Sequence, residues 1–77
     1  MKRVDEPIRV QRSGKRIEAV YWHGRRIKVH AQTNAWIVRS RWWGVDEKRI
    51  YRTLETGMGL MEVYQVGDLW RLSRIAD

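Results

Sequence analysis

Aromatic and basic side chains alternate most densely between Trp36 and Trp43. In an extended strand every second side chain shares a face, so Arg39, Arg41 and Trp43 would point to one side. Aromatic rings stack on unpaired bases, at roughly 1–3 kcal/mol per base, and basic groups follow the phosphates. This spacing therefore predicts a nucleic-acid site centred on these three residues, with single-stranded DNA as the favoured ligand and RNA or duplex as the alternatives. The alternative is that Trp43 packs at the rim of a barrel beneath an arginine.

Further basic side chains extend the predicted site. Arg26 and Lys28 alternate with apolar residues on an expected strand. If that strand lies beside the strand that contains Trp43, the cations form one face that neutralises phosphates without reading bases. The other interpretation is a solvated polar face with no ligand. The predicted nucleic-acid contacts are Arg26, Lys28, Arg39, Arg41, Trp43, Arg52 and Arg71.

The same residue types also predict a protein interface, because Trp, Tyr and Arg are enriched among the residues that dominate binding energy. Trp22 alternates with Ile17 and Tyr21 and is expected on the opposite, exposed face. In this alternative the chain binds a protein partner or a second copy of itself as a homodimer. The predicted interface residues are Trp22, Trp43 and Tyr51.

Catalytic and metal chemistry are not indicated. Ser13 falls in an expected turn, and no G-x-S-x-G motif is present. His23 lies beside a turn and His30 at the far end of the next strand, so the two do not form a metal-ligand pair. Without cysteine, disulfides and thiolate metal sites are excluded. The sequence predicts a protein that is not an enzyme, with no catalytic residue, metal or cofactor.

The charge balance supports a nucleic-acid partner. Sixteen Lys and Arg against nine Asp and Glu give a formal net charge of +7. Such a basic domain is typical of nucleic-acid binders, although a GC-rich genome also favours arginine. No apolar run approaches the roughly 20 residues of a membrane span, and the N-terminus turns acidic where a signal peptide would be apolar. We expect a cytoplasmic protein without membrane contact.

The elements that must position these side chains are expected to be strands. β-Branched residues outnumber Leu and Ala, and glycines recur at the spacing of turns between short strands. A helix from Asp46 to Glu55 is the alternative for one segment, but Ile50, Tyr51 and Thr53 favour a strand there. Strands are expected at Val4–Arg12, Arg16–His23, Arg26–Ala31, Trp36–Trp43, Arg49–Glu55, Leu60–Val66 and Leu69–Ile75.

Seven short strands in 77 residues are too few for a large sandwich. They predict a single small domain over residues 1–77, built as a strongly bent antiparallel sheet or closed barrel of SH3-like or OB-like size. About six strands are expected, because two of the segments can be halves of one bent strand. Alternation places Trp36, Trp42 and Trp70 in the core.

The order of aromatic residues resembles that of a known family. The matching segments are Pro7-Ile8-Arg9-Val10, Trp22-His23-Gly24-Arg25, Trp36, Trp42-Trp43, Arg49-Ile50-Tyr51-Arg52, Glu62-Val63-Tyr64 and Trp70-x-Leu72-x-Arg74 with Asp77. This order is similar to a small all-β domain family of unknown function that stands alone in bacteria. A similar module ends the catalytically inactive Y-family polymerase homologues of the mutasome, a translesion-synthesis assembly. The resemblance implies proximity to DNA repair and supplies no activity.

Overall fold

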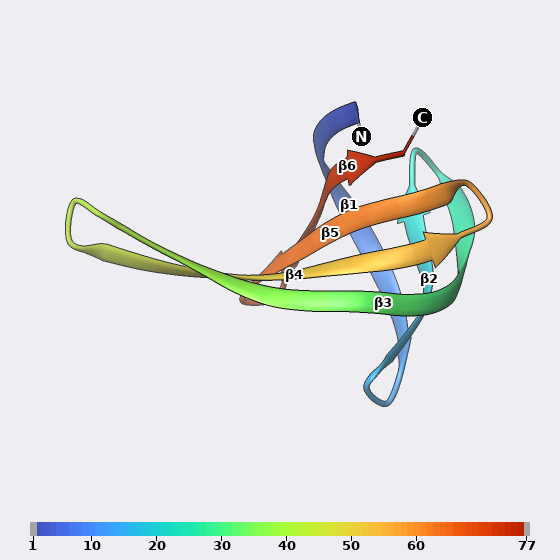
Figure 1. Cartoon of the computed structure of the whole chain (residues 1–77), viewed down its shortest axis with the longest axis horizontal. Helices are drawn as coiled ribbons and strands as arrows, with labels where there is room; N and C mark the ends of the chain where they lie inside the picture. Colours follow the sequence, from blue (N-terminus) through green and yellow to red (C-terminus); the bar gives the residue numbers. More distant parts are fainter. Residues whose placement is uncertain (1, 77) are drawn as a thin grey trace.

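The computed structural model describes residues 2–76, and Trp42 by its backbone alone. The strands are β1 (Lys2–Ser13), β2 (Arg16–Trp22), β3 (Arg25–Trp42), β4 (Val45–Thr56), β5 (Gly59–Val66) and β6 (Leu69–Ile75). Each strand pairs antiparallel with the next, and β1 pairs with β6 to close the barrel (Figure 1). The predicted all-β barrel is confirmed, as is the strand rather than a helix after Asp46. Within the described residues no helix is long and apolar enough to span a membrane.

Two-residue turns join several of the strands. His23 and Gly24 have φ of 51° and 72°, and Trp43 and Gly44 have 54° and 78°. Positive φ at both central positions is the geometry that matches the twist of a hairpin, and glycine adopts it without steric cost. The expected strands leave residues 44–48 between Trp43 and Arg49 as a connection, but β4 already begins at Val45.

Strand β3 is one continuous element of 18 residues, although the sequence predicts two strands there. Its first residues pair with β2, and the remainder pairs with β4. The register against β4 shifts between Val29 and Ala31 and again between Gln32 and Asn34. Each shift is a bulge that bends the strand, so one strand serves both halves of the barrel.

The barrel interior is a compact apolar cluster. Val20, Leu54, Met61, Val63 and Leu72 are fully buried at its centre. Burying one such side chain contributes about 1.5–3 kcal/mol, so the cluster is the main source of stability. The outer members of the cluster are Ile8, Ile17, Ile27 and Val29, with Val4, Val10, Trp22, Trp70 and Ile75 packed partly buried against it.

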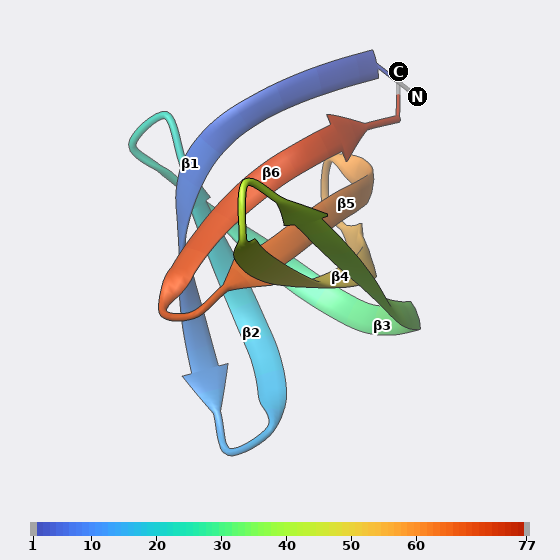
Figure 2. The same cartoon turned by 90° about the vertical axis from the view of Figure 1, so that its left-hand side faces the viewer.

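The β3–β4 hairpin projects from the barrel. The last pair between β4 and β5 is Ile50 with Gln65, whereas β3 and β4 stay paired as far as Trp42 and Val45. Residues 38–49 therefore form a two-stranded ribbon, called the arm here, which leaves the barrel at the left of Figure 1 and faces the viewer in Figure 2. Figure 2 also shows that the β1–β2 hairpin extends in a different direction.

Candidate nucleic-acid interface

The positive charge of the chain is concentrated on the β1–β2–β3 meander. Residues 8–28 contain seven Lys and Arg and a single Glu, a formal net charge of +6. The rest of the chain holds nine cations and eight acids, a net charge of +1. Since these residues form consecutive hairpins, the fold keeps the charge on one part of the molecule.

The centre of this region is a cross-strand row of three side chains. Tyr21 on β2 pairs with Arg9 on β1 and with Arg26 on β3. Directly paired residues point to the same side of a sheet, so the phenol lies between two guanidinium groups. Tyr21 is 38% exposed and retains accessible ring surface. We call Arg9, Arg16, Tyr21, Arg26 and Lys28 the basic face.

Gln11 holds two members of the basic face in place. The Tyr21 hydroxyl donates to Oε1 of Gln11 at 3.0 Å, and Arg26 Nε donates to the same oxygen at 3.4 Å. The amide of Gln11 donates in turn to the Glu18 carboxylate at 3.2 Å. Glu18, the one acidic residue of positions 8–28, therefore accepts a hydrogen bond from an amide and does not pair with a cation.

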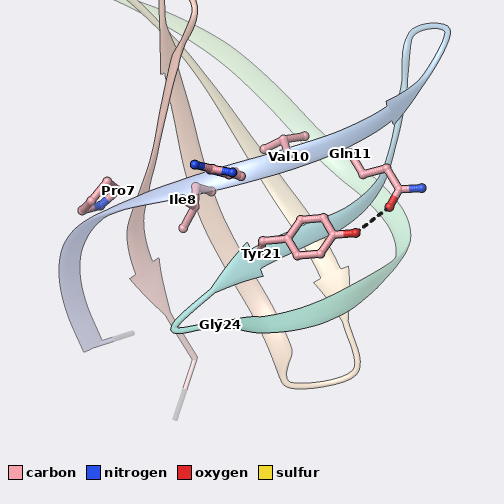
Figure 3. Close-up of a pocket in the computed structure, with 7 residues that line it drawn as sticks. Pro7, Ile8, Val10, Gln11, Tyr21 and Gly24 are labelled. Atoms are coloured by element: carbon pink, nitrogen blue, oxygen red, sulfur yellow. Dashed lines mark hydrogen bonds between the residues drawn. The ribbon is translucent and has the colours of Figure 1, made fainter.

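Two open hollows border the basic face. The larger, with a volume of about 820 Å³, is lined by Tyr21, Arg9 and Gln11 together with Pro7, Ile8, Val10 and Gly24. Figure 3 shows the Tyr21 ring beside β1, with its hydroxyl turned to Gln11. The smaller, of about 280 Å³, is lined by Arg16, Arg26 and Lys28 with Glu18 and Val29. Cations thus border both openings, and the larger one also offers apolar and aromatic surface.

The cations of this meander differ from the others in their pairing. Within the described residues, no Lys or Arg of positions 8–28 forms an ion pair with a carboxylate. Outside that segment four arginines do, namely Arg41, Arg49, Arg71 and Arg74. Unpaired guanidinium and ammonium groups keep their donors available for an external anion such as phosphate.

The predicted contact residues are not brought together as the sequence analysis expects. Arg26 and Lys28 belong to the basic face, but Arg39 and Arg41 lie on the arm. Arg26 and Arg39 lie thirteen positions apart on the same strand, about 40 Å of extended chain. A single basic face would require the two expected strands to be neighbours, and this condition is not met because both belong to one strand, β3.

Trp43 is exposed, as the nucleic-acid hypothesis requires, but it does not share a strand face with Arg39 and Arg41. It occupies the tip of the arm, in the turn, and is 96% exposed. No arginine covers its ring among the described contacts, so the rim-packing alternative does not hold.

Arg52 and Arg71 are both engaged by other residues of the chain, Arg52 partly buried and Arg71 at the surface. The Arg52 guanidinium lies 4.9 Å from the centroid of the Trp70 ring and donates to Gln65, and burial lowers its pKa. Arg71 donates to the Asp5 carboxylate at 3.2 Å and to the Asp5 carbonyl at 2.8 Å. Both arginines have structural partners that a phosphate contact would have to displace.

The remaining aromatic predictions also change. Trp36 does not join the core cluster; it stacks on Tyr51 with ring centroids 5.4 Å apart, and Tyr51 contacts Tyr64 at 5.1 Å. Trp22 is not an exposed anchor, because it packs partly buried against the core and stacks on His23 at 4.4 Å. The expected core position of Trp42 concerns a side chain outside the described residues.

A bulge in β2 explains why Tyr21 and Trp22 lie on the opposite faces from those predicted. Gln11 pairs with Ala19 and Arg12 pairs with Ile17, so Glu18 is an extra residue on β2. A bulge of this kind reverses which face the following side chains occupy. Simple alternation from Ile17 therefore assigns Tyr21 and Trp22 to the wrong sides. A count of charge by segment is the sequence signal that would have singled out Arg9 and Arg16.

The histidines and acidic residues were examined as metal ligands, and the chain was compared with known proteins. Within residues 2–76, no cluster of three or more His, Cys, Asp or Glu residues is placed to hold a metal ion. His23 instead lies 2.6 Å from the Glu6 carboxylate and lowers its pKa through a hydrogen bond. Comparisons with family models, curated proteins and solved structures found no match.

Proposed function

We propose that the chain is a non-catalytic nucleic-acid-binding module whose ligand, single-stranded DNA, lies on the basic face. The observation that carries the proposal is that this face gathers four of the seven cations of residues 8–28, Arg9, Arg16, Arg26 and Lys28, none of which forms an ion pair with a carboxylate among the described residues. A polyanion gains affinity on such a surface by releasing its counterions. The proposal keeps the predicted ligand and moves the site from Trp43 to Tyr21.

Within the basic face, the cations would bind phosphates and Tyr21 would stack on a base. Arg9 and Arg26 pair with Tyr21 from the two neighbouring strands and would contact phosphates on either side of it, while Arg16 and Lys28 would extend the path beside the smaller hollow. The larger hollow has the volume typical of a small-ligand site, and one nucleobase would stack against Tyr21 there. Because no base edge is read, binding should show little sequence preference.

Polarisation of a labelled single-stranded oligonucleotide tests this function. Arg26→Ala is expected to weaken binding markedly. Arg74→Ala is the matched control, because it makes the same change in charge on β6 at a residue that pairs with Glu62. Equal affinities for both variants would show that only net charge matters, and absence of binding by the unaltered chain would exclude the function.

A second candidate function, protein binding, is favoured by the outer face of β3 to β6. Trp36, Tyr51 and Tyr64 form a stacked row there. Val38, 38% exposed, lies two positions from Trp36 on β3 and shares the face of this row. Leu69, 73% exposed, pairs with Val66, which lies two positions from Tyr64 on β5, so it shares that face too. A protein partner or a second copy would cover this apolar surface. Sedimentation of the chain and of Leu69→Glu tests self-association.

The proposal includes a role in DNA repair. Cytoplasmic single-stranded DNA arises at sites of repair, and the resemblance to the mutasome module is consistent with a role there. Binding without catalysis would suit a module that holds DNA for other components of an assembly.

A further inference from the structure

The arm contains residues that are unfavourable for its stability as a free hairpin. It is a two-stranded ribbon, about 17 Å long from Val38 to Trp43, with solvent on both faces. Isolated two-stranded ribbons are marginally stable in water. A residue that destabilises the arm therefore has a large effect, because the free energy that stabilises a two-stranded ribbon is small.

Two features of the arm are unfavourable in isolation. Arg39 and Lys48 pair directly across the ribbon, and like charges in such positions destabilise a sheet. Trp43 has φ of 54°, a conformation better suited to Gly or Asn, and leaves 96% of its surface in solvent. An anionic ligand between the two cations would relieve their repulsion, and an apolar contact would remove the indole from solvent.

The acids of the arm do not neutralise this pair. Asp46 lies 3.6 Å from Arg41, and Glu47 pairs with Arg49. With four cations and two acids, residues 38–49 have a net charge of +2. The uncompensated charge is that of Arg39 and Lys48, which line a hollow of about 210 Å³ on the ribbon together with Ser40, Arg41, Asp46 and Glu47.

We propose that the arm lies in the major groove of duplex DNA, with Arg39 and Lys48 on phosphates and Trp43 against base edges. The major groove is about 12 Å wide and admits a two-stranded ribbon, whereas the minor groove, about 6 Å wide, does not. The proposal goes beyond the basic face, because it assigns a different surface and a different form of the ligand. Together the two surfaces would suit a junction between duplex and single strand.

The test compares a blunt duplex with a single-stranded oligonucleotide of the same sequence, for Arg39→Ala/Lys48→Ala and for Trp43→Asn. Asn adopts the turn conformation readily, so Trp43→Asn removes the indole while it preserves the hairpin. The double variant should reduce the slope of log K against log salt for the duplex by about 1.8, for two lost phosphate contacts. Trp43→Asn should weaken duplex binding several-fold, and neither variant should change single-strand binding.

Other outcomes overturn the proposal in distinguishable ways. Unchanged duplex binding would show that the arm makes no contact, and equal losses on both probes would assign the arm to single strands. No duplex binding by the unaltered chain, or capture of a second copy through the arm, would also exclude it. Arg26→Ala, measured in parallel, tests the basic face alone. The two proposals, for the basic face and for the arm, can therefore be rejected independently.

Discussion

Tyr21 and Arg26 pair across β2 and β3 and donate hydrogen bonds to the same oxygen, Oε1 of Gln11. This shared acceptor fixes a phenol beside a guanidinium group before any ligand arrives. Side chains that are already ordered lose less conformational entropy on binding, so the pair is suited to hold a base and its phosphate.

The Tyr21 ring, rather than its hydroxyl, is expected to carry the base contact. Tyr21→Ala should weaken single-strand binding by about fivefold or more, the effect of losing one aromatic–base stack. Tyr21→Phe should retain most of the affinity, because it removes only the bond to Gln11. Fluorescence polarisation measures both. If Tyr21→Phe binds as weakly as Tyr21→Ala, stacking is not the contribution of this residue.

Gln11→Ala is expected to weaken binding without removing any contact to the ligand, because Tyr21 and Arg26 would both lose their common acceptor. The loss should be smaller than that of Tyr21→Ala. Gln65→Ala is the matched control, since Gln65 accepts a hydrogen bond from Arg52 away from the basic face. Equal affinities of Gln11→Ala and the unaltered chain would show that ordering by Gln11 contributes nothing.

Asp5 is expected to make the stability depend on pH. Its hydrogen bond from Arg71 lowers the pKa of the Asp5 carboxyl. A lowered folded-state pKa stabilises the fold above the ordinary Asp value, and this stabilisation is lost as the pH falls through the lowered value. Asp5 has φ of 52°, which Asn tolerates. Asp5→Asn should therefore reduce the free energy of unfolding at neutral pH and make little difference near about pH 2.

Urea unfolding across that pH range measures the Asp5 effect. Asp68→Asn is the control, because Asp68 lies in an exposed turn and forms no ion pair among the described residues. A difference for Asp5→Asn that stays constant from neutral to acid pH would contradict the ion-pair explanation.

The buried cluster is expected to set the stability. Leu54 is fully buried, so Leu54→Ala should cost about 2–5 kcal/mol of unfolding free energy. Leu69→Ala is the surface control, because Leu69 is 73% exposed, and it should change the free energy of unfolding by no more than about 0.5 kcal/mol. Urea denaturation compares them. Similar losses for both variants would show that the cluster is not the main source of stability.

The barrel could be predicted from the sequence because strand propensity and glycine turns act locally. The β4 strand and the turns at Gly14, Gly24 and Gly67 follow from those signals. The bulges could not be predicted, because they depend on which strand lies opposite. One bulge moved Tyr21 to the outer face, and two others joined the expected strands before and after Gln32.

The proposed site keeps only part of the residue set predicted from the sequence. Arg26 and Lys28 remain in it, whereas Arg52 and Arg71 are held by Gln65 and Asp5. Residue type reveals that a side chain can bind phosphate, but its availability depends on partners that the fold supplies from distant positions.

The most direct test is the salt dependence of single-strand binding by the unaltered chain and by Lys28→Ala. With four cations on phosphates, the slope of log K against log salt should be near about −3, and Lys28→Ala should reduce its magnitude by about 0.7. Arg74→Ala should leave the slope unchanged. An affinity that does not vary with salt, or a slope that Lys28→Ala does not alter, would contradict binding on the basic face.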